Sequence, residues 1–431
     1  MTPFPVADLR REFPAIAQAG DFLFFDNAAG AQVPANVIAA VTDHLVSRNV
    51  QRGGPYGRSQ EVDAMIGRAR EAVAAFVNAR EPSEIAFGLN ATSFIRSISL
   101  AVGQTLGARQ EIVVTDLDHE ANIATWVALE RAGARLVWWT VRADGRLSLE
   151  DLDALVSERT RLIACTVASN ATGTRVDVAA VARRAQAAGA EVLLDAVHYG
   201  PHGPIDVQAF DCDYLVCSGY KIFAPHMGFA WCRAEAINRL PTFREAFIPD
   251  VTPDKLEAGT YAYENVAGME AVVQYLERLG RRLGADSGSP RRAVVRIAME
   301  AIAAYERTLS AALLDAVQSI EGAVVHGVTD RGQLADRVPT VSFTVDGVAS
   351  SAIAAQLAAV GIGARSGHMY APRLMQRLEL MPEGTVRVSL VHYNTLDEIA
   401  RFRERLTEAV AALRALRPTR RQDAGVPTAG R

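Results

Sequence analysis

The chain has 431 residues, of which 49% are hydrophobic and 22% are charged, with a formal net charge of −4. This composition excludes disorder throughout, and the weak negative balance provides no chain-wide attraction to nucleic acid or anionic membranes. The N-terminal stretch lacks a continuous apolar signal segment, and no run approaches ~18 apolar residues. We therefore expect a cytoplasmic protein that binds neither nucleic acid nor membrane.

Two residue types are informative because they are rare. The four cysteines, Cys165, Cys212, Cys217 and Cys232, lie in or beside apolar runs and form no CxxC pair, so we expect buried, reduced thiols and no metal centre. Only two of the 45 basic residues are lysines, Lys221 and Lys255. A mechanism that needs a lysine has two candidates.

Residues 85–235 alternate short β-branched runs with longer helical stretches, which is typical of a mainly parallel sheet covered by helices. A helix is expected after Ser148, which with Asp151 resembles a capping box, and another is expected to end at Gly189. The expected strands are 111–116, 134–141, 161–168, 191–197 and 213–218.

The pattern changes after residues 281–292, a segment rich in Gly, Ser, Pro and charge that we expect to be a connector. The expected elements beyond it are a helix (293–318), a strand (340–347), a helix (350–359), a strand (385–391) and a final helix from Thr395. A chain of this length exceeds the roughly 250–300 residues at which single cores divide. We therefore expect an N-terminal segment (1–25) that packs with the small domain, a large domain (26–280), a small α+β domain (293–416) and a disordered tail (417–431).

Asp195 and Lys221 stand at the ends of two expected strands. Asp195 ends one buried strand, and Lys221 follows the next across a Ser218-Gly219-Tyr220 turn. Both are expected at the carboxyl edge of the sheet, where open α/β sheets bind ligands. A lysine can form a Schiff base with pyridoxal 5′-phosphate, and a carboxylate can keep the pyridine nitrogen protonated. Either residue alone fits a helix cap or a surface charge, but the pair predicts this cofactor in the large domain.

Nine motifs along the chain resemble, in family order, the class V aminotransferases and specifically their cysteine desulfurases. They are FFDNAAG (24–30), NVQRG (49–53), DHEANIATW (118–126), SNATGT (169–174), DAVH (195–198), SGYK (218–221), EAGT (257–260), ARSGH (364–368) and VRVSLVHYNT (386–395). The resemblance covers most of the chain. It implies an α/β protein with the type I fold of pyridoxal-phosphate-dependent transferases, in which the large domain has a mainly parallel sheet and the C-terminal domain is a smaller α+β unit.

The resemblance also implies the residues that bind the cofactor. Lys221 corresponds to the Schiff-base lysine, Asp195 to the partner of the pyridine nitrogen, and His119 to the histidine that stacks on the ring. The other implied contacts are Asn170 near the phenolic oxygen, Ala91, Thr92 and Ser218 at the phosphate, and Thr260 at the phosphate of a neighbouring subunit, and His198 and Tyr220 are also implied to bind the cofactor. His198 replaces glutamine and Tyr220 replaces histidine of the desulfurases. The role of Thr260 implies a homodimer with shared active sites.

Three residues are implied to bind an amino-acid substrate. Arg387 matches the arginine that clamps the α-carboxylate, a task that suits the planar guanidinium, and Arg365 and Ala29 are matched to the same site.

The resemblance breaks in the loop where desulfurases carry the cysteine that accepts sulfur. That position is Tyr370, and no cysteine follows Cys232. A phenol cannot accept sulfur as a thiolate does. Tyr370 or His368 could act as a second acid, or the tyrosine could simply fill the vacant volume. The chain is similar to a desulfurase-like subgroup that has SxYK and an aromatic residue in place of the cysteine.

These observations favour a C–S lyase that performs β-elimination without a persulfide cysteine. The alternatives are a racemase or epimerase similar to isopenicillin N epimerase, a transaminase, and, in a different class, a non-catalytic scaffold that keeps the fold. A nicotinamide-dependent oxidoreductase is disfavoured because no GxGxxG follows an early strand.

Overall fold

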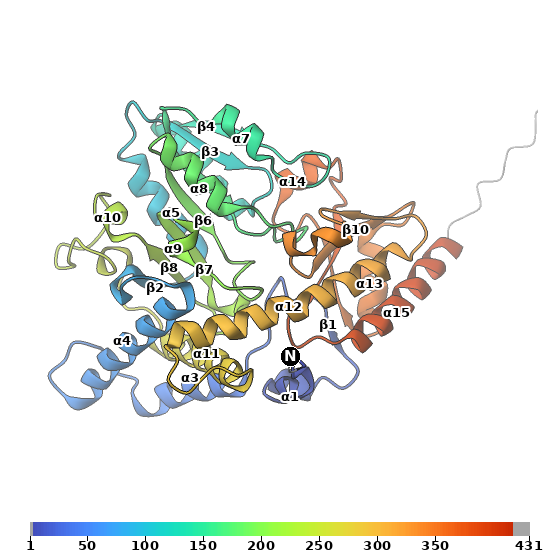
Figure 1. Cartoon of the computed structure of the whole chain (residues 1–431), viewed down its shortest axis with the longest axis horizontal. Coiled ribbons are helices and arrows are strands. Elements are labelled where there is room, and N and C mark those ends of the chain that lie inside the picture. Colours follow the sequence, from blue (N-terminus) through green and yellow to red (C-terminus); the bar gives the residue numbers. More distant parts are fainter. Residues whose placement is uncertain (1–2, 417–431) are drawn as a thin grey trace, which may run out of the picture.

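A seven-stranded sheet forms the centre of the larger part of the molecule in the computed structural model, which describes residues 3–416 (Figure 1). In spatial order its strands are β2 (Ile85–Gly88), β8 (Gly228–Cys232), β7 (Tyr214–Ser218), β6 (Glu191–Asp195), β5 (Thr160–Thr166), β3 (Glu111–Thr115) and β4 (Arg135–Trp139). β8 runs antiparallel to the other six strands, which all point the same way. The five predicted strands are confirmed to within two residues at each end. β2 and β8 were not predicted from the sequence.

Helices cover both faces of this sheet, as predicted. Ile112 and Val114 of β3 pack into one apolar cluster with α5, whereas Val113 packs into the other with α8. Alternate residues of a strand point to opposite faces, so strands covered on both sides read as continuous apolar runs. The helices up to the connector are α1 (Val6–Arg11), α2 (Pro14–Ala17), α3 (Ala35–Ser47), α4 (Gly57–Val77), α5 (Ala91–Gly103), α6 (Ala124–Val127), α7 (Leu149–Leu155), α8 (Val178–Ala187), α9 (Val207–Phe210), α10 (Ala234–Ile237) and α11 (Tyr263–Arg282).

A second, antiparallel sheet lies in the C-terminal part of the chain. Its strands in spatial order are β12 (Arg365–Gly367), β13 (Thr385–Ser389), β10 (Thr340–Val345) and β9 (Ala323–His326). The predicted strands and helices of this part are confirmed, but β9 and β12 were not predicted, because β9 is a half-exposed edge and β12 has only three residues. The helices here are α12 (Arg291–Gln318), α13 (Ser350–Ala359), α14 (Pro372–Arg377) and α15 (Leu396–Ala415).

The long helix α12 joins the two parts of the molecule. It packs against α4 and α11 beside the large sheet and against α15 and β9 beside the small one (Figure 1). The expected connector at 281–292 was too long, since α11 continues through Arg282 and α12 already begins at Arg291. The expected capping box was also wrong. A helix does begin after Ser148, but the Ser148 side chain makes no capping hydrogen bond.

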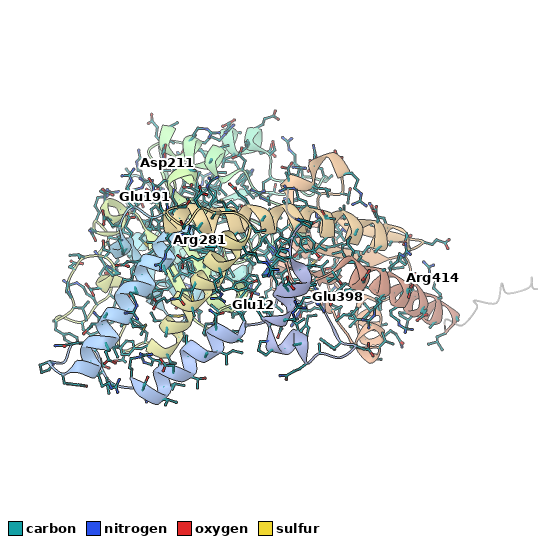
Figure 2. All side chains as sticks on the ribbon, turned by 60° about the horizontal axis from the view of Figure 1, so that its bottom comes forward. Glu12, Glu191, Asp211, Arg281, Glu398 and Arg414 are labelled. Carbon is teal, nitrogen blue, oxygen red and sulfur yellow. The ribbon has the colours of Figure 1, made fainter. Side chains whose placement is uncertain are left out.

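The N-terminal segment contacts the C-terminal part of the chain. β1 (Leu23–Phe24) pairs in parallel with β11 (Ile362–Gly363), and Arg10 forms an ion pair of 2.8 Å with Glu398, which lies beside the N-terminal helices (Figure 2). The domain boundaries stay a prediction, and the predicted tail lies outside the described residues. All four cysteines are buried and free of disulfides. Within residues 3–416, no helix combines the length and apolar character needed to cross a bilayer.

Candidate active site

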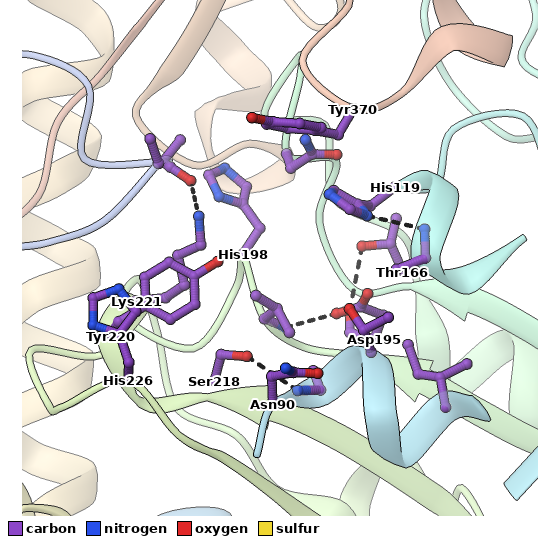
Figure 3. A pocket seen from close by; sticks show the side chains of 18 of the residues that line it. Asn90, His119, Thr166, Asp195, His198, Ser218, Tyr220, Lys221, His226 and Tyr370 are labelled. Carbon is purple, nitrogen blue, oxygen red and sulfur yellow. Dashed lines mark hydrogen bonds between the residues drawn. The ribbon is translucent and has the colours of Figure 1, made fainter. Parts of the chain in front are cut away.

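A cavity of about 600 Å³ lies at the carboxyl edge of the large sheet, where Asp195 ends β6 and Ser218 ends β7 (Figure 3). Residues from both parts of the molecule line it. The predicted site residues that it brings together are Ala29, Ala91, Thr92, His119, Asn170, Asp195, His198, Ser218, Tyr220, Lys221, Arg365, Tyr370 and Arg387. Two predicted residues, Thr260 and His368, do not line it.

Asp195 lies on one side of the cavity and is 6% exposed. Its Oδ1 accepts a hydrogen bond of 2.9 Å from the backbone N–H of Val197. Burial raises the pKa of Asp195 to about 6, although this hydrogen bond and Lys221 oppose the shift. A cationic ring nitrogen placed against this carboxylate would favour its ionised form.

Lys221 lies across the cavity from Asp195 (Figure 3). It stands at the end of a short 3₁₀ turn after β7, and its Nζ donates to the carbonyl of Ala28. Burial, together with the positive charges of Arg387 and Arg365, lowers the pKa of Lys221 to about 7. A sizeable fraction of the amine is therefore neutral at neutral pH, and the neutral amine is the form that attacks a carbonyl.

His119 lies above Asp195 in the loop that follows β3 (Figure 3). Its Nδ1 accepts a hydrogen bond of 3.0 Å from the backbone N–H of Ala121. Burial, and then the charges of Lys221 and Arg387, lower the pKa of His119 to about 4, so the ring is neutral. A neutral imidazole fixed by its Nδ1 can lie flat against an aromatic ligand.

The far end of the cavity is formed by the N-terminus of α5 (Figure 3). The backbone N–H of Ala91 points at Ser218 Oγ, at 3.4 Å. A Cβ at Gly228 would lie 2.4 Å from the carbonyl carbon of Asn90, so glycine is required for β8 to approach this helix end. A helix N-terminus with a nearby hydroxyl is a favourable site for a phosphate.

Asn170 and His198 occupy the wall near the small sheet. Asn170 Nδ2 donates to the carbonyl of Met369 at 2.6 Å, while its Oδ1 is buried and has no partner within residues 3–416. His198 Nε2 lies 3.1 Å from Thr340 Oγ1, and burial holds the pKa of His198 well below its ordinary value. Each of the two side chains therefore makes one hydrogen bond to the C-terminal part of the chain.

Asp26 binds two arginines of the cavity wall, and its role was not predicted from the sequence. Its two carboxylate oxygens bind two arginines of the small sheet, with Arg387 Nη2 at 2.8 Å and Arg365 Nη2 at 2.9 Å. Arg387 is buried, and its Nη1 also donates to the carbonyl of Asn170 at 2.9 Å, leaving its Nε without a partner in the described residues. The motif FFDNAAG contained Asp26, but only the folded chain shows what it binds.

Tyr370 lies at the mouth of the cavity, opposite Ser218 (Figure 3). The residue is 57% exposed, and its ring centroid is 5.7 Å from that of His119. Its backbone is tied to the His119 loop, because the N–H of Glu120 donates to the carbonyl of Tyr370 at 2.8 Å. Arg373 adds an ion pair of 3.3 Å to Glu120. The tyrosine loop is thus fastened to the same segment that positions His119.

The remaining predicted residues have other positions. His368 is outside the cavity wall, and its Nδ1 accepts a hydrogen bond of 3.0 Å from the backbone N–H of Tyr370, so it supports the loop. Thr260 is exposed and contacts Gln51 at 3.3 Å. Tyr220 does line the cavity, and Lys221 Nζ lies 4.7 Å from the centre of its ring.

The cavity fits pyridoxal phosphate by its volume and its donor set. Its volume falls within the roughly 300–1,000 Å³ that is usual for cofactor sites. Asn170 Oδ1 is a buried acceptor that lacks a partner in the described residues, as expected where a ligand completes the site. No cysteine is among the residues that line the cavity, and burial raises the pKa of the Cys165 thiol well above its ordinary value.

Comparisons with known proteins agree with this geometry. The chain matches the family model of Aminotransferase class-V over residues 23–285 and 292–402. It is 33% identical over 407 residues to the Aminotransferase-like protein FGM3 of Gibberella zeae, covering 92% of this chain and 96% of the relative. It is 31% identical over 427 residues to Probable cysteine desulfurase 2 of Mycobacterium leprae, covering 93% and 96%.

The fold is similar to solved cysteine desulfurases. The match to CsdA of Escherichia coli has a TM-score of 0.82 at 26% identity and covers 95% of this chain and 99% of that one. The match to the enzyme of Thermococcus onnurineus has a TM-score of 0.83 at 25% identity and covers 96% and 100%.

Proposed function

Because the chain belongs to the aminotransferase class-V family and is a pyridoxal-phosphate-dependent enzyme, we propose that it is a C–S lyase that needs no persulfide cysteine. The observation that carries this proposal is Tyr370, a phenol fixed at the mouth of a cavity whose described lining contains no thiol. The proposed substrates are cysteine, cystine and cysteine conjugates.

The reaction breaks the Cα–H and Cβ–S bonds of the substrate. The electron pair of the C–H bond forms the Cα=Cβ double bond, and the pair of the C–S bond leaves with sulfur. After gaining a proton, the sulfur is released as hydrogen sulfide from cysteine, as thiocysteine from cystine, or as a thiol from a cysteine conjugate. Hydrolysis with one water then gives pyruvate and ammonia. Pyridoxal phosphate, when bound, supplies the electron sink that stabilises negative charge at Cα.

Different polar residues of the cavity bind the substrate and move the protons in this reaction. Arg387, which is buried, binds the α-carboxylate, and Arg365 assists, so the substrate carboxylate competes with Asp26 for both guanidinium groups. Lys221 Nζ accepts the Cα proton, a role that its lowered pKa supports. Asp195 holds the proton on the ring nitrogen of the cofactor.

Tyr370 then donates its phenolic proton to the departing sulfur. The hydrogen bonds of its loop to Glu120 and Asn170 keep the tyrosine near His119. A fixed proton donor suits β-elimination, whereas sulfur transfer to another protein requires a thiolate.

Product analysis tests this function. The holoenzyme should release pyruvate, ammonia and the sulfur product in equal amounts from at least one substrate: hydrogen sulfide from cysteine, thiocysteine from cystine, or a thiol from an S-alkyl cysteine. Formation of the D-amino acid, or amino transfer to an added keto acid without release of sulfur, would contradict the proposal and support the epimerase or the transaminase.

The attachment site of the cofactor gives the next prediction. Borohydride treatment should fix pyridoxal phosphate to the peptide that contains Lys221, as read by mass spectrometry. Lys255 serves as the internal control, because it is 2% exposed and its Nζ binds Asp250 at 2.9 Å and the carbonyl of Leu240 at 2.9 Å, outside the cavity. Label on Lys255 would refute the site.

The four cysteines should remain free of persulfide during turnover. They are buried, and burial raises the pKa of each thiol, so little thiolate is present at neutral pH. Mass spectrometry after incubation with L-cysteine should find no added sulfur. A persulfide that passes sulfur to an acceptor would restore the desulfurase assignment.

We also propose that the enzyme is a homodimer in which Thr260 reaches the cofactor phosphate of the partner. Thr260 is exposed and does not line the cavity of its own chain, which supports this arrangement. Sedimentation should give a dimer, and Thr260→Val should weaken cofactor binding by about tenfold, as for loss of one hydrogen bond to a charged group. Thr407→Val on the exposed side of α15 is the matched control. A monomer with full cofactor affinity would contradict the proposal.

A further inference from the structure

A second cavity, of about 290 Å³, lies beside α12, next to the turn that follows β6. It shares no lining residue with the cofactor cavity. Its walls come from Arg175 before α8, from the turn after β6, from α12 and from residues 334–339 before β10. Its volume is several times the roughly 30 Å³ of a water molecule, so a small molecule fits there.

Three arginines line this second cavity: Arg175, Arg307 and Arg337. None has a carboxylate within 4.0 Å of its guanidinium nitrogens in the described part of the chain. On the same helix as Arg307, by contrast, Arg292 pairs with Asp206 at 3.3 Å and Arg296 with Glu300 at 2.7 Å. The positive charges of Arg175, Arg307 and Arg337 are therefore not neutralised by ion pairs among the residues that the structure describes.

Arg337 is the buried member of the three and is 4% exposed. It donates only to backbone carbonyls, including that of Thr340 at 2.5 Å. Burying a cation without a counter-charge is costly, and burial accordingly lowers the pKa of Arg337 to about 10. Arg175 is held in place by the carbonyl of Ala335 at 2.7 Å and by the ring of Tyr199, whose centre is 5.0 Å from the guanidinium carbon.

The two carboxylates that line this cavity bind other partners. Glu300 is paired with Arg296, and Glu306 Oε2 is paired with His202 Nδ1 at 2.8 Å. The other oxygen of Glu306, Oε1, is buried and has no hydrogen-bond partner among residues 3–416. An unsatisfied buried acceptor is destabilising, and the hydroxyl group of a ligand would satisfy it by donating a hydrogen bond.

We propose that this cavity binds a small oxyanion that carries a hydroxyl group, such as hydrogen phosphate or a short hydroxycarboxylate. Arg175 and Arg307, at the exposed rim, bind the charged oxygens, and Arg337 adds positive potential from below. Glu306 Oε1 accepts a hydrogen bond from the ligand hydroxyl. The site adjoins the catalytic cavity, because Thr340, whose carbonyl binds Arg337, also contacts His198 through its Oγ1 at 3.1 Å.

Calorimetry with the holoenzyme tests this site, because its bound cofactor already fills the catalytic phosphate position. Inorganic phosphate and L-malate are the probes, and sulfate and succinate are their counterparts without a hydroxyl. We expect at least one probe to bind with one site per chain and at least fivefold more tightly than its counterpart. Binding of inorganic phosphate would identify the ligand as a phosphate, and binding of L-malate would identify it as a hydroxycarboxylate. L-malate is also titrated into Arg387→Gln, in which binding at the catalytic carboxylate site is lost but binding here should persist.

The double variant Arg175→Gln/Arg307→Gln should lose at least tenfold in affinity for the bound probe. Arg183→Gln/Arg403→Gln removes the same charge at two exposed arginines outside the cavity and should bind as the parent does. The proposal is overturned if neither probe binds, if sulfate and succinate bind as tightly as the probes, or if the two double variants behave alike.

Discussion

Asp195→Asn is expected to lower turnover by about 10²–10³-fold, the range found when a preorganised electrostatic contact of a reaction centre is removed. Asparagine keeps the volume of the side chain and an oxygen that can accept from Val197 N, but it cannot supply the negative charge that holds a proton on the ring nitrogen. Steady-state turnover at saturating substrate and cofactor measures the effect. Asp195→Ala should lose as much, and unchanged turnover in either variant would refute the assigned role.

The stability of the apoenzyme separates this electrostatic role from a structural one. Folding raises the pKa of Asp195 from about 3.9 to about 6, so its carboxylate destabilises the fold above pH 6, by something on the order of 3 kcal/mol. That cost disappears as the pH falls from 6 to below 4. Asp195→Asn should therefore melt at a higher temperature than the parent at pH 7, with a gap that narrows on acidification. A lower melting temperature at pH 7 would indicate that the residue supports the fold.

The neighbouring ends of β6 and β7 explain why the centre of the site was predictable. Asp195 is the last residue of one strand, Lys221 follows the next, and the strands pair in parallel with Asp195 opposite Val216. Parallel neighbours end at the same edge, so two strand ends read from the sequence bring two side chains to one cavity. The same alternation of buried strands and helices predicted five of the seven strands.

Other features depended on contacts that no local pattern contains. Asp26 is separated by more than 300 residues from the two arginines that it binds, so its role required the packing of the N-terminal segment beside the small sheet. His368 was matched through its motif, but the backbone turns at Met369 and Tyr370, which both have positive φ. That turn directs Tyr370 to the cavity and leaves His368 bonded to the backbone of the loop.

The effect of Tyr370→Phe decides between a catalytic phenol and a residue that only fills the loop. Phenylalanine keeps the ring, the backbone hydrogen bonds of the loop and the contact with His119, and removes only the hydroxyl. Loss of a proton donor to the departing sulfur should lower turnover about 100-fold, within the usual range for general acid catalysis. Cofactor affinity should not change, because the substituted oxygen lies at the mouth of the cavity, opposite the phosphate end (Figure 3).

A comparison of substrates whose departing thiols differ in basicity gives a more specific test of this role. A thiolate of low basicity needs little help from an acid, whereas an alkyl thiolate needs a proton as the C–S bond breaks. Tyr370→Phe should therefore impair S-alkyl cysteines strongly and conjugates with an electron-poor aryl thiol only slightly, with His368→Gln as the control on the same loop. Equal losses of turnover for both leaving groups would indicate that the tyrosine only supports the structure of the loop. Near-normal turnover for both would indicate that it only fills space. Only a loss that grows with the basicity of the departing thiol is consistent with proton donation from the phenol.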